Sequence, residues 1–138
     1  MFNLNVFDTV SHANAGSELH LLHPVTKTPV YLDEKETKAI TISLLGSDSD
    51  VYTKEIQKKA KELRRQKNNA SEIDLEKNVR EACELYSKLT VGFKNIPSDD
   101  GKALEFSQKA AFELYMKYKD IRVQVGDFIS EQANFIKD

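Results

Sequence analysis

The chain has 138 residues, of which 40% are hydrophobic and 30% charged, and it contains no tryptophan. Domains cluster at roughly 100–150 residues, so the length predicts a single domain over residues 1–138 that can fold without a metal or a disulfide. The net charge of −2 argues against a general nucleic-acid binder, because such proteins carry a basic surplus. The single cysteine, Cys83, excludes an internal disulfide.

The first residues of the chain contain no basic segment and no long apolar segment, so we expect no signal peptide. No stretch approaches the roughly 18 consecutive apolar residues that a membrane-spanning helix needs. These two features favour a protein of the cytosol that does not enter a membrane.

The N-terminal third of the chain has the pattern of short strands. Residues 1–16 are irregular or weakly helical, with Asp8 or Thr9 as a cap and Gly16 as the stop. Residues 18–23 and 29–32 flank a proline-containing turn and predict two short strands near a sheet edge. Residues 39–44 alternate apolar and polar side chains, which predicts a half-buried strand. The charged residues 33–38 form a solvated connection.

Four helices follow. Ser47 and Asp50 approximate a capping box before a helix that ends near residues 67–69. Ser71 caps a second helix, which extends to Leu89. A third helix follows Ser107, and a fourth, weakened by a glycine, follows it. Each has apolar residues at helical spacing. In chain order these are Tyr52, Ile56, Ala60 and Leu63; Leu75, Val79, Ala82, Cys83, Tyr86 and Leu89; Ala110, Ala111, Leu114, Tyr115 and Tyr118; and Ile121, Val125, Phe128 and Ile129.

Residues 90–106 contain turn signals with apolar side chains between them. Pro97 keeps the preceding residue out of a helix, and Asp100-Gly101 is a tight-turn dipeptide. We therefore expect a compact loop that buries Phe93, Ile96, Leu104 and Phe106. Taken together, the sequence predicts an α+β fold that is predominantly helical, with a small N-terminal hairpin or three-stranded element followed by about four helices.

No pattern in the chain indicates catalysis, a metal or a cofactor. His20 and His23 lie three residues apart, which places them on opposite faces of a strand, and no cysteine is near them. The 47–50 segment lacks the ligand spacing of an EF-hand, and helix capping explains it. Cys83 lies within an apolar stripe, which favours a buried, inert thiol. We therefore expect no enzyme, no metal site and no cofactor.

The best basic patch lies at residues 54–67. It has seven lysines and arginines against two glutamates. A solvated helix face with pairs four residues apart explains it, and acidic residues on the next helix can neutralise it. Contact with nucleic-acid phosphates, as in a nucleic-acid-binding regulator, is a weaker alternative that predicts salt-sensitive DNA binding.

Aromatic and apolar residues near the C-terminus are the candidates for contact with a partner. Helical spacing favours a core role for Tyr115 and Tyr118, but both are large aromatic residues near the C-terminus and so are also candidates for contact with a partner. Phe135 and Ile136 lie at the chain end, where apolar residues either dock onto the domain or contact a partner. We take Tyr115, Tyr118, Phe135 and Ile136 as candidate partner-binding residues.

Two ordered stretches resemble the tail assembly chaperones of long-tailed bacteriophages and prophages. The first runs from Leu19 to Thr26, with His23-Pro24 in its turn, and continues through residues 40–42 and 45–52. The second comprises residues 91–96, Asp100-Gly101, residues 104–107, Ala110, residues 114–115, 121–125, 128–129 and Asn134-Phe135. The family often has a tryptophan where this chain has Phe93. The segment 54–88 is similar only in its helical character.

The resemblance implies a non-catalytic helper in virion assembly. Such proteins bind the aggregation-prone tape measure protein, which makes it the expected partner, with the major tail tube protein as a further candidate and self-association expected. The resemblance further implies location in the bacterial cytoplasm and absence from the mature virion, and this chain would correspond to the shorter of two forms that some members have. A structural tail or head–tail component that stays in the virion is the alternative.

Overall fold

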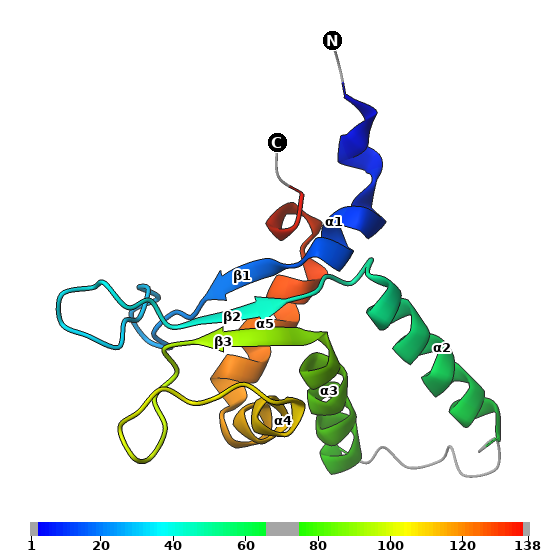
Figure 1. Ribbon diagram of the computed structural model, residues 1–138. Helices are drawn as coiled ribbons and strands as arrows, with labels where there is room; N and C mark the ends of the chain where they lie inside the picture. The colour runs from blue at the N-terminus through cyan, green and yellow to red at the C-terminus, as the bar shows by residue number, and fades with distance from the viewer. Residues whose placement is uncertain (1–2, 66–74, 137–138) are drawn as a thin grey trace.

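The computed structural model describes residues 3–65 and 75–136 (Figure 1). Within these residues, five α-helices and two short 3-10 helices accompany one three-stranded antiparallel sheet. The predicted fold class, α+β with a predominance of helix, is confirmed.

The sheet has the strand order β1 (Ser17–His20), β2 (Thr41–Leu44), β3 (Thr90–Lys94). In its register, Leu19 lies opposite Ile42, which lies opposite Phe93. The alternation that predicted the central strand is confirmed, because Ile42 and Leu44 are fully buried in the core.

The predicted strand at residues 29–32 is wrong, since this segment makes only isolated bridges. Pro29 pairs with Leu22, and Tyr31 pairs with Ala39. A proline has no backbone N–H to donate, so a regular ladder cannot continue through it. The third strand is instead β3, which was expected to be loop. Its Thr90, Val91 and Phe93 are residue types that favour strands.

Short helices occupy the N-terminal segment. The 3-10 helix η1 (Leu4–Phe7) precedes α1 (Thr9–Ala15). The Asp8 carboxylate accepts a hydrogen bond from Ser11 N at 3.1 Å, and Gly16 ends the helix with a φ of 82°. The expected cap at Asp8 and stop at Gly16 are therefore confirmed.

Helices α2 (Asp50–Arg65) and α3 (Leu75–Leu89) follow the sheet's central strand. The residue before α2 is Ser49, whose buried hydroxyl accepts from Tyr52 N at 3.2 Å. The cap is thus Ser49 rather than the predicted Ser47, because it is Ser49 whose hydroxyl reaches the free N–H groups of the first turn. The expected helix end at 67–69 and the expected cap at Ser71 lie outside the described residues.

Two helices and a 3-10 turn complete the chain: α4 (Gln108–Lys117), α5 (Lys119–Ser130) and η2 (Gln132–Asn134). The predicted cap Ser107 accepts from Ala110 N at 3.0 Å. The predicted turn is also present, with Gly101 N donating to Ser98 O at 3.0 Å and a φ of 81° at Gly101. Of the four loop residues expected to be buried, Ile96 is buried, whereas Phe106 is exposed.

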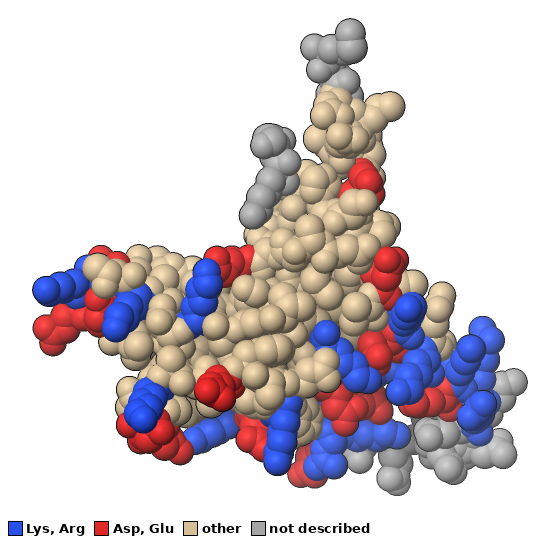
Figure 2. All heavy atoms as spheres, in the orientation of Figure 1, with Lys and Arg blue, Asp and Glu red and all other residues tan. Residues whose placement is uncertain are grey.

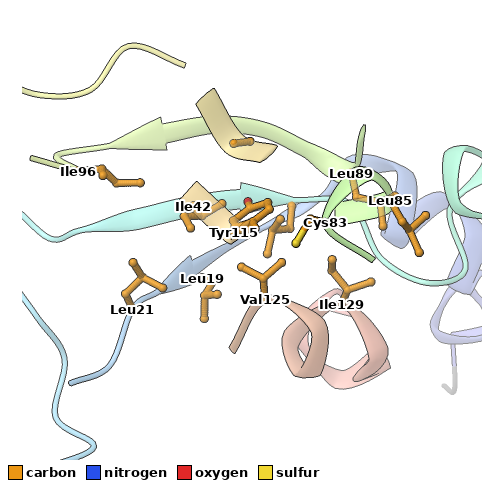
Figure 3. Close-up of a cluster of buried hydrophobic side chains, with 12 residues drawn as sticks. Leu19, Leu21, Ile42, Cys83, Leu85, Leu89, Ile96, Tyr115, Val125 and Ile129 are labelled. Carbon is orange, nitrogen blue, oxygen red and sulfur yellow. The ribbon is translucent and has the colours of Figure 1, made fainter. Parts of the chain in front are cut away.

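The core lies between the sheet and the layer formed by α3, α4 and α5, whereas α2 lies at the edge of that layer beside α3 (Figure 1). Side chains from the sheet and from these helices converge there, as Figure 3 shows for Ile42, Tyr115 and Val125. The buried core residues are Leu19, Leu21, Ile42, Leu44, Cys83, Leu85, Leu89, Ile96, Ala111, Tyr115, Val125 and Ile129.

Candidate functional site

A groove with a volume of 540 Å³ opens between residues 21–40, the loop after β3 and the junction of α4 with α5. We call it the Tyr118 groove. Its polar rim contains Lys117, Lys119, Asp120 and Gln124. Its apolar lining consists of Leu21, Leu22, Pro24, Val30, Ile40, Ile96, Pro97, Leu114, Tyr118 and Ile121.

One wall is built from the long connection between β1 and β2. Leu21 N donates to Ile40 O at 3.0 Å, Val30 N donates to Leu21 O at 3.0 Å, and Ile40 N donates to Val30 O at 3.2 Å. His23 Nδ1 accepts from the backbone N–H groups of Val25 and Thr26, which makes it the turn residue that the sequence predicted. These hydrogen bonds give an irregular segment a fixed apolar surface.

Gln124 joins this wall to α5. Its Oε1 accepts from Leu22 N at 2.9 Å, and its Nε2 donates to Leu22 O at 2.8 Å and to Asp120 Oδ2 at 2.7 Å. One amide side chain thus satisfies both backbone polar groups of Leu22, as a neighbouring strand would. The groove keeps its width because this contact ties its two sides together.

Tyr118 forms the rim at the junction of α4 and α5. Its backbone is extended, with φ −115° and ψ 100°, so it ends one helix and precedes the next. Its side chain is 46% exposed, and Lys117 Nζ lies 5.3 Å from the centre of its ring. A large aromatic side chain next to a cation is therefore available at the groove mouth.

Tyr115, a second candidate from the sequence, lies in the core. It is fully buried, and its hydroxyl lies 2.6 Å from Thr90 Oγ1. Burial raises the pKa of the Tyr115 hydroxyl. A partner cannot touch this side chain on the surface described here.

The other two candidates lie where the C-terminal segment docks onto its own domain. Phe135 is buried and packs edge-to-face on Phe128 with ring centres 5.4 Å apart, and it lies so close to Gly46 that a Cβ at that position would meet its ring. Ile136 is half-buried. Because Phe135 follows the end of α5 and Tyr118 precedes its start, the structure does not bring these candidates together (Figure 1).

Sequence reasoning did not identify Gln124 or the wall formed by residues 21–30 as part of a site. Gln124 lies 102 positions from Leu22 in the chain, and a local sequence pattern does not predict a contact between residues so far apart. The proline-bounded apolar run at Leu21-Leu22 was the available signal, but it was interpreted as a strand.

Apolar walls with a few polar groups at the rim give the groove the character of a site that can hold a ligand or a partner's side chain. Among the described residues, no three histidine, cysteine or acidic side chains gather as a metal site would require. Cys83 is fully buried, and burial raises the pKa of its thiol. His20 Nε2 lies 2.8 Å from Val30 O and its ring packs on Tyr31.

In the described ranges 3–65 and 75–136, no helix has both the length and the apolar character needed to cross a membrane.

A family model described as "YdaY prophage protein" matches residues 47–138, which is more than half of the chain. The matched part contains α2, α3, β3, α4 and α5, and it includes Tyr118 and Gln124. Strands β1 and β2 and the wall at residues 21–40 precede it. No curated protein and no solved structure matches the chain.

Proposed function

We propose that this chain, which belongs to the YdaY prophage protein family, is a non-catalytic tail assembly chaperone. In this proposal it binds the tape measure protein in the cytoplasm of the bacterial host, keeps it soluble while the tail assembles, and is absent from the mature virion.

The observation that carries the proposal is the convergence of the two resembling stretches on the Tyr118 groove. Leu21 and Leu22 come from the first stretch, whereas Ile96, Leu114 and Ile121 come from the second, and all line the groove. Residues that carry the resemblance therefore form one surface although they are far apart in the chain. This supports a shared binding role for that surface.

The groove has the chemistry that a helical, aggregation-prone partner requires. Helix-in-groove recognition places a few large apolar side chains of an amphipathic helix into an apolar cleft. The Tyr118 ring and the lysines at the rim give an aromatic contact and a polar edge, as protein interfaces commonly have. A partner helix would cover its own apolar stripe there and so would not aggregate.

The first experiment is co-expression with the tape measure protein encoded in the same gene cluster, followed by affinity capture and size exclusion. We expect a soluble complex that is lost when this chain is left out. A tape measure protein that stays insoluble with this chain present, and is not captured, would contradict the proposal.

Variants at the rim of the Tyr118 groove then test whether the tape measure protein binds there. Tyr118→Glu and Leu22→Glu place a charge at the groove, at side chains that are 46% and 36% exposed, so folding should be retained. Val10→Glu in α1 is the matched control, since Val10 is 45% exposed and does not line the groove. We expect the two rim variants, and not the control, to lose capture while their melting temperatures stay near that of the parent protein.

The alternative is a structural tail or head–tail component, which would remain in the mature virion, whereas a chaperone would not. Mass spectrometry of purified virions from the induced prophage separates the two. A chaperone should be missing from the particles, whereas a structural component should be present in a fixed copy number.

A further inference from the structure

A second hollow, with a volume of 220 Å³, adjoins the Tyr118 groove between α4 and the loop after β3. Its own lining includes Leu104 and Ala110, together with the acidic residues Asp99 and Glu113. It shares four lining residues with the groove, namely Pro97, Leu114, Lys117 and Tyr118. The two hollows therefore form one continuous surface, which we call the extended groove.

Helix α4 turns one face toward the extended groove. Each residue advances about 100° around a helix, so Ala110, Leu114 and Lys117 lie within an arc of about 60°. Glu113 lies about 40° beyond Lys117, on the same side of the helix. Ala110 and Lys117 are seven residues apart, which is about 10 Å along the axis, or two turns of a partner helix. The charged and the apolar lining residues of α4 thus face the same occupant.

Two carboxylates without an ion-pair partner line the second hollow. Asp99 and Glu113 are exposed, and neither forms an ion pair within the described residues. Lys117 is the one cation in the described lining, and its Nζ lies 5.3 Å from the centre of the Tyr118 ring. Figure 2 shows acidic side chains over the loop after β3 and over α4, with basic side chains among them. The lining of the second hollow itself carries two negative charges and one positive charge.

We propose that the second hollow binds a lysine or arginine side chain of the partner helix whose apolar stripe occupies the Tyr118 groove. The aliphatic stem of that side chain lies against Leu104 and Ala110, and its cation lies at the carboxylates of Asp99 and Glu113. The inference rests on the proposed function and sharpens it, because the apolar stripe of the partner must continue into a basic residue.

The chemistry of the lining favours this occupant over others. Long basic side chains bury their methylene groups along apolar surface while the charged end stays in water, which suits an apolar floor with an acidic rim. An acidic side chain, or a nucleic-acid phosphate, would be repelled by both carboxylates. A helix that is apolar throughout would leave them without a partner. Complementary charge also fixes where along the groove the helix stops.

The test uses the full chain and three fluorescein-labelled synthetic helices of about 20 residues, a length at which an isolated helix can form. All three have the same leucine stripe. The stripe is followed at both ends by arginine in the first helix, by glutamine in the second and by glutamate in the third, so that either direction of docking presents this residue to the second hollow. In a fluorescence anisotropy titration we expect the arginine helix to bind about fivefold more tightly than the glutamine helix, and the glutamate helix to bind most weakly. Added salt should reduce these differences.

Three variants place the effect at the second hollow. Asp99→Asn with Glu113→Gln should remove the preference for arginine over glutamine. Glu34→Gln with Glu84→Gln is the matched control, because it changes the net charge equally at exposed residues outside both hollows, and it should bind as the parent protein does. Tyr118→Glu should weaken all three helices, since each needs the Tyr118 groove for its leucines.

A preference for arginine that the Asp99 and Glu113 changes leave unchanged would overturn the inference, as would equal binding of the three helices or no binding of any. An oligomer in light scattering that the same double variant dissociates would assign the second hollow to another copy of this chain instead. Capture of the tape measure protein separates this inference from the proposed function. If the parent protein and the Asp99 and Glu113 variant capture it equally at several salt concentrations, the inference fails and the proposed function stands.

Discussion

Helices α2 and α3 are consecutive and similar in length and in apolar spacing, yet they have different environments. They have 16 and 15 residues, and both have apolar side chains at helical spacing. Helix α3 packs against α4, α5 and β3 and buries four residues, whereas α2 buries none. Amphipathic periodicity therefore predicts that a segment is helical, but the area of the remaining core decides whether its stripe is covered.

The largest effect is expected from a substitution that creates a cavity beside α3. Leu89 is fully buried, and we expect Leu89→Ala to lower the free energy of unfolding by about 2–5 kcal/mol, because the lost contacts leave a void in the core. Urea denaturation measures the change, with the dependence of the free energy of unfolding on urea concentration held equal for the two proteins. A loss as small as that of the same substitution in α2 would contradict the distinction between the two helices.

The second test concerns the hydrogen bond that links α4 to the end of α3 at the start of β3. Thr90 Oγ1 donates to Tyr86 O at 2.7 Å, so the Tyr115 hydroxyl, 2.6 Å away, is the donor to Thr90. Tyr115→Phe removes this donor and leaves the threonine bonded to Tyr86. We expect the free energy of unfolding to decrease by about 1 kcal/mol at pH 7.

The effect of this substitution should depend on pH. The pKa of Tyr115 is raised in the folded protein, so above about pH 10 the unfolded chain loses a proton that the folded chain retains. The parent protein is therefore destabilised as pH rises, and the Phe variant lacks this contribution. The gap between the two proteins should narrow in alkaline solution. Denaturation curves at pH 7 and pH 10.5 measure it, and a constant gap would contradict the assignment.

The parts of this fold that the sequence predicted have local causes. Ser107, Asp8 and Asp100-Gly101 act on backbone groups within a few residues, and each is found in the expected role. The strand β3 and the Gln124 contact depend on pairing with distant segments. Residues 90–94 follow a helix directly, and only β2 beside them makes them a strand.

Of the candidate site, the sequence identified Tyr118 but not its neighbours in the groove, because the groove also depends on contacts between distant segments. Apolar residues near the C-terminus were chosen by composition, and that criterion does not separate buried from exposed side chains. Tyr115 and Tyr118 lie three positions apart, but the helix break at Tyr118 exposes the second while α4 buries the first. Long-range packing decided which of the two lines the groove.

A smaller effect is expected where α2 is joined to α3. Lys88→Ala removes the ion pair with Glu55, and pairs that are partly exposed contribute about 0.2–1 kcal/mol. The main change should be local, with faster hydrogen exchange of α2 amides and little change in the amides of α3. Lys109→Ala, an exposed lysine that has no ion pair within the described residues, is the control and should leave both helices unchanged.

The smallest effect is expected from Leu63→Ala. Leu63 is 70% exposed, so its truncation opens no cavity, and alanine has the higher helix propensity. The free energy of unfolding should stay within about 0.5 kcal/mol of the parent value. The same leucine-to-alanine change would then cost several kcal/mol in α3 and almost nothing in α2. If the loss in α2 were large and grew with protein concentration, a second copy would be covering the stripe, because stability that depends on association increases with concentration.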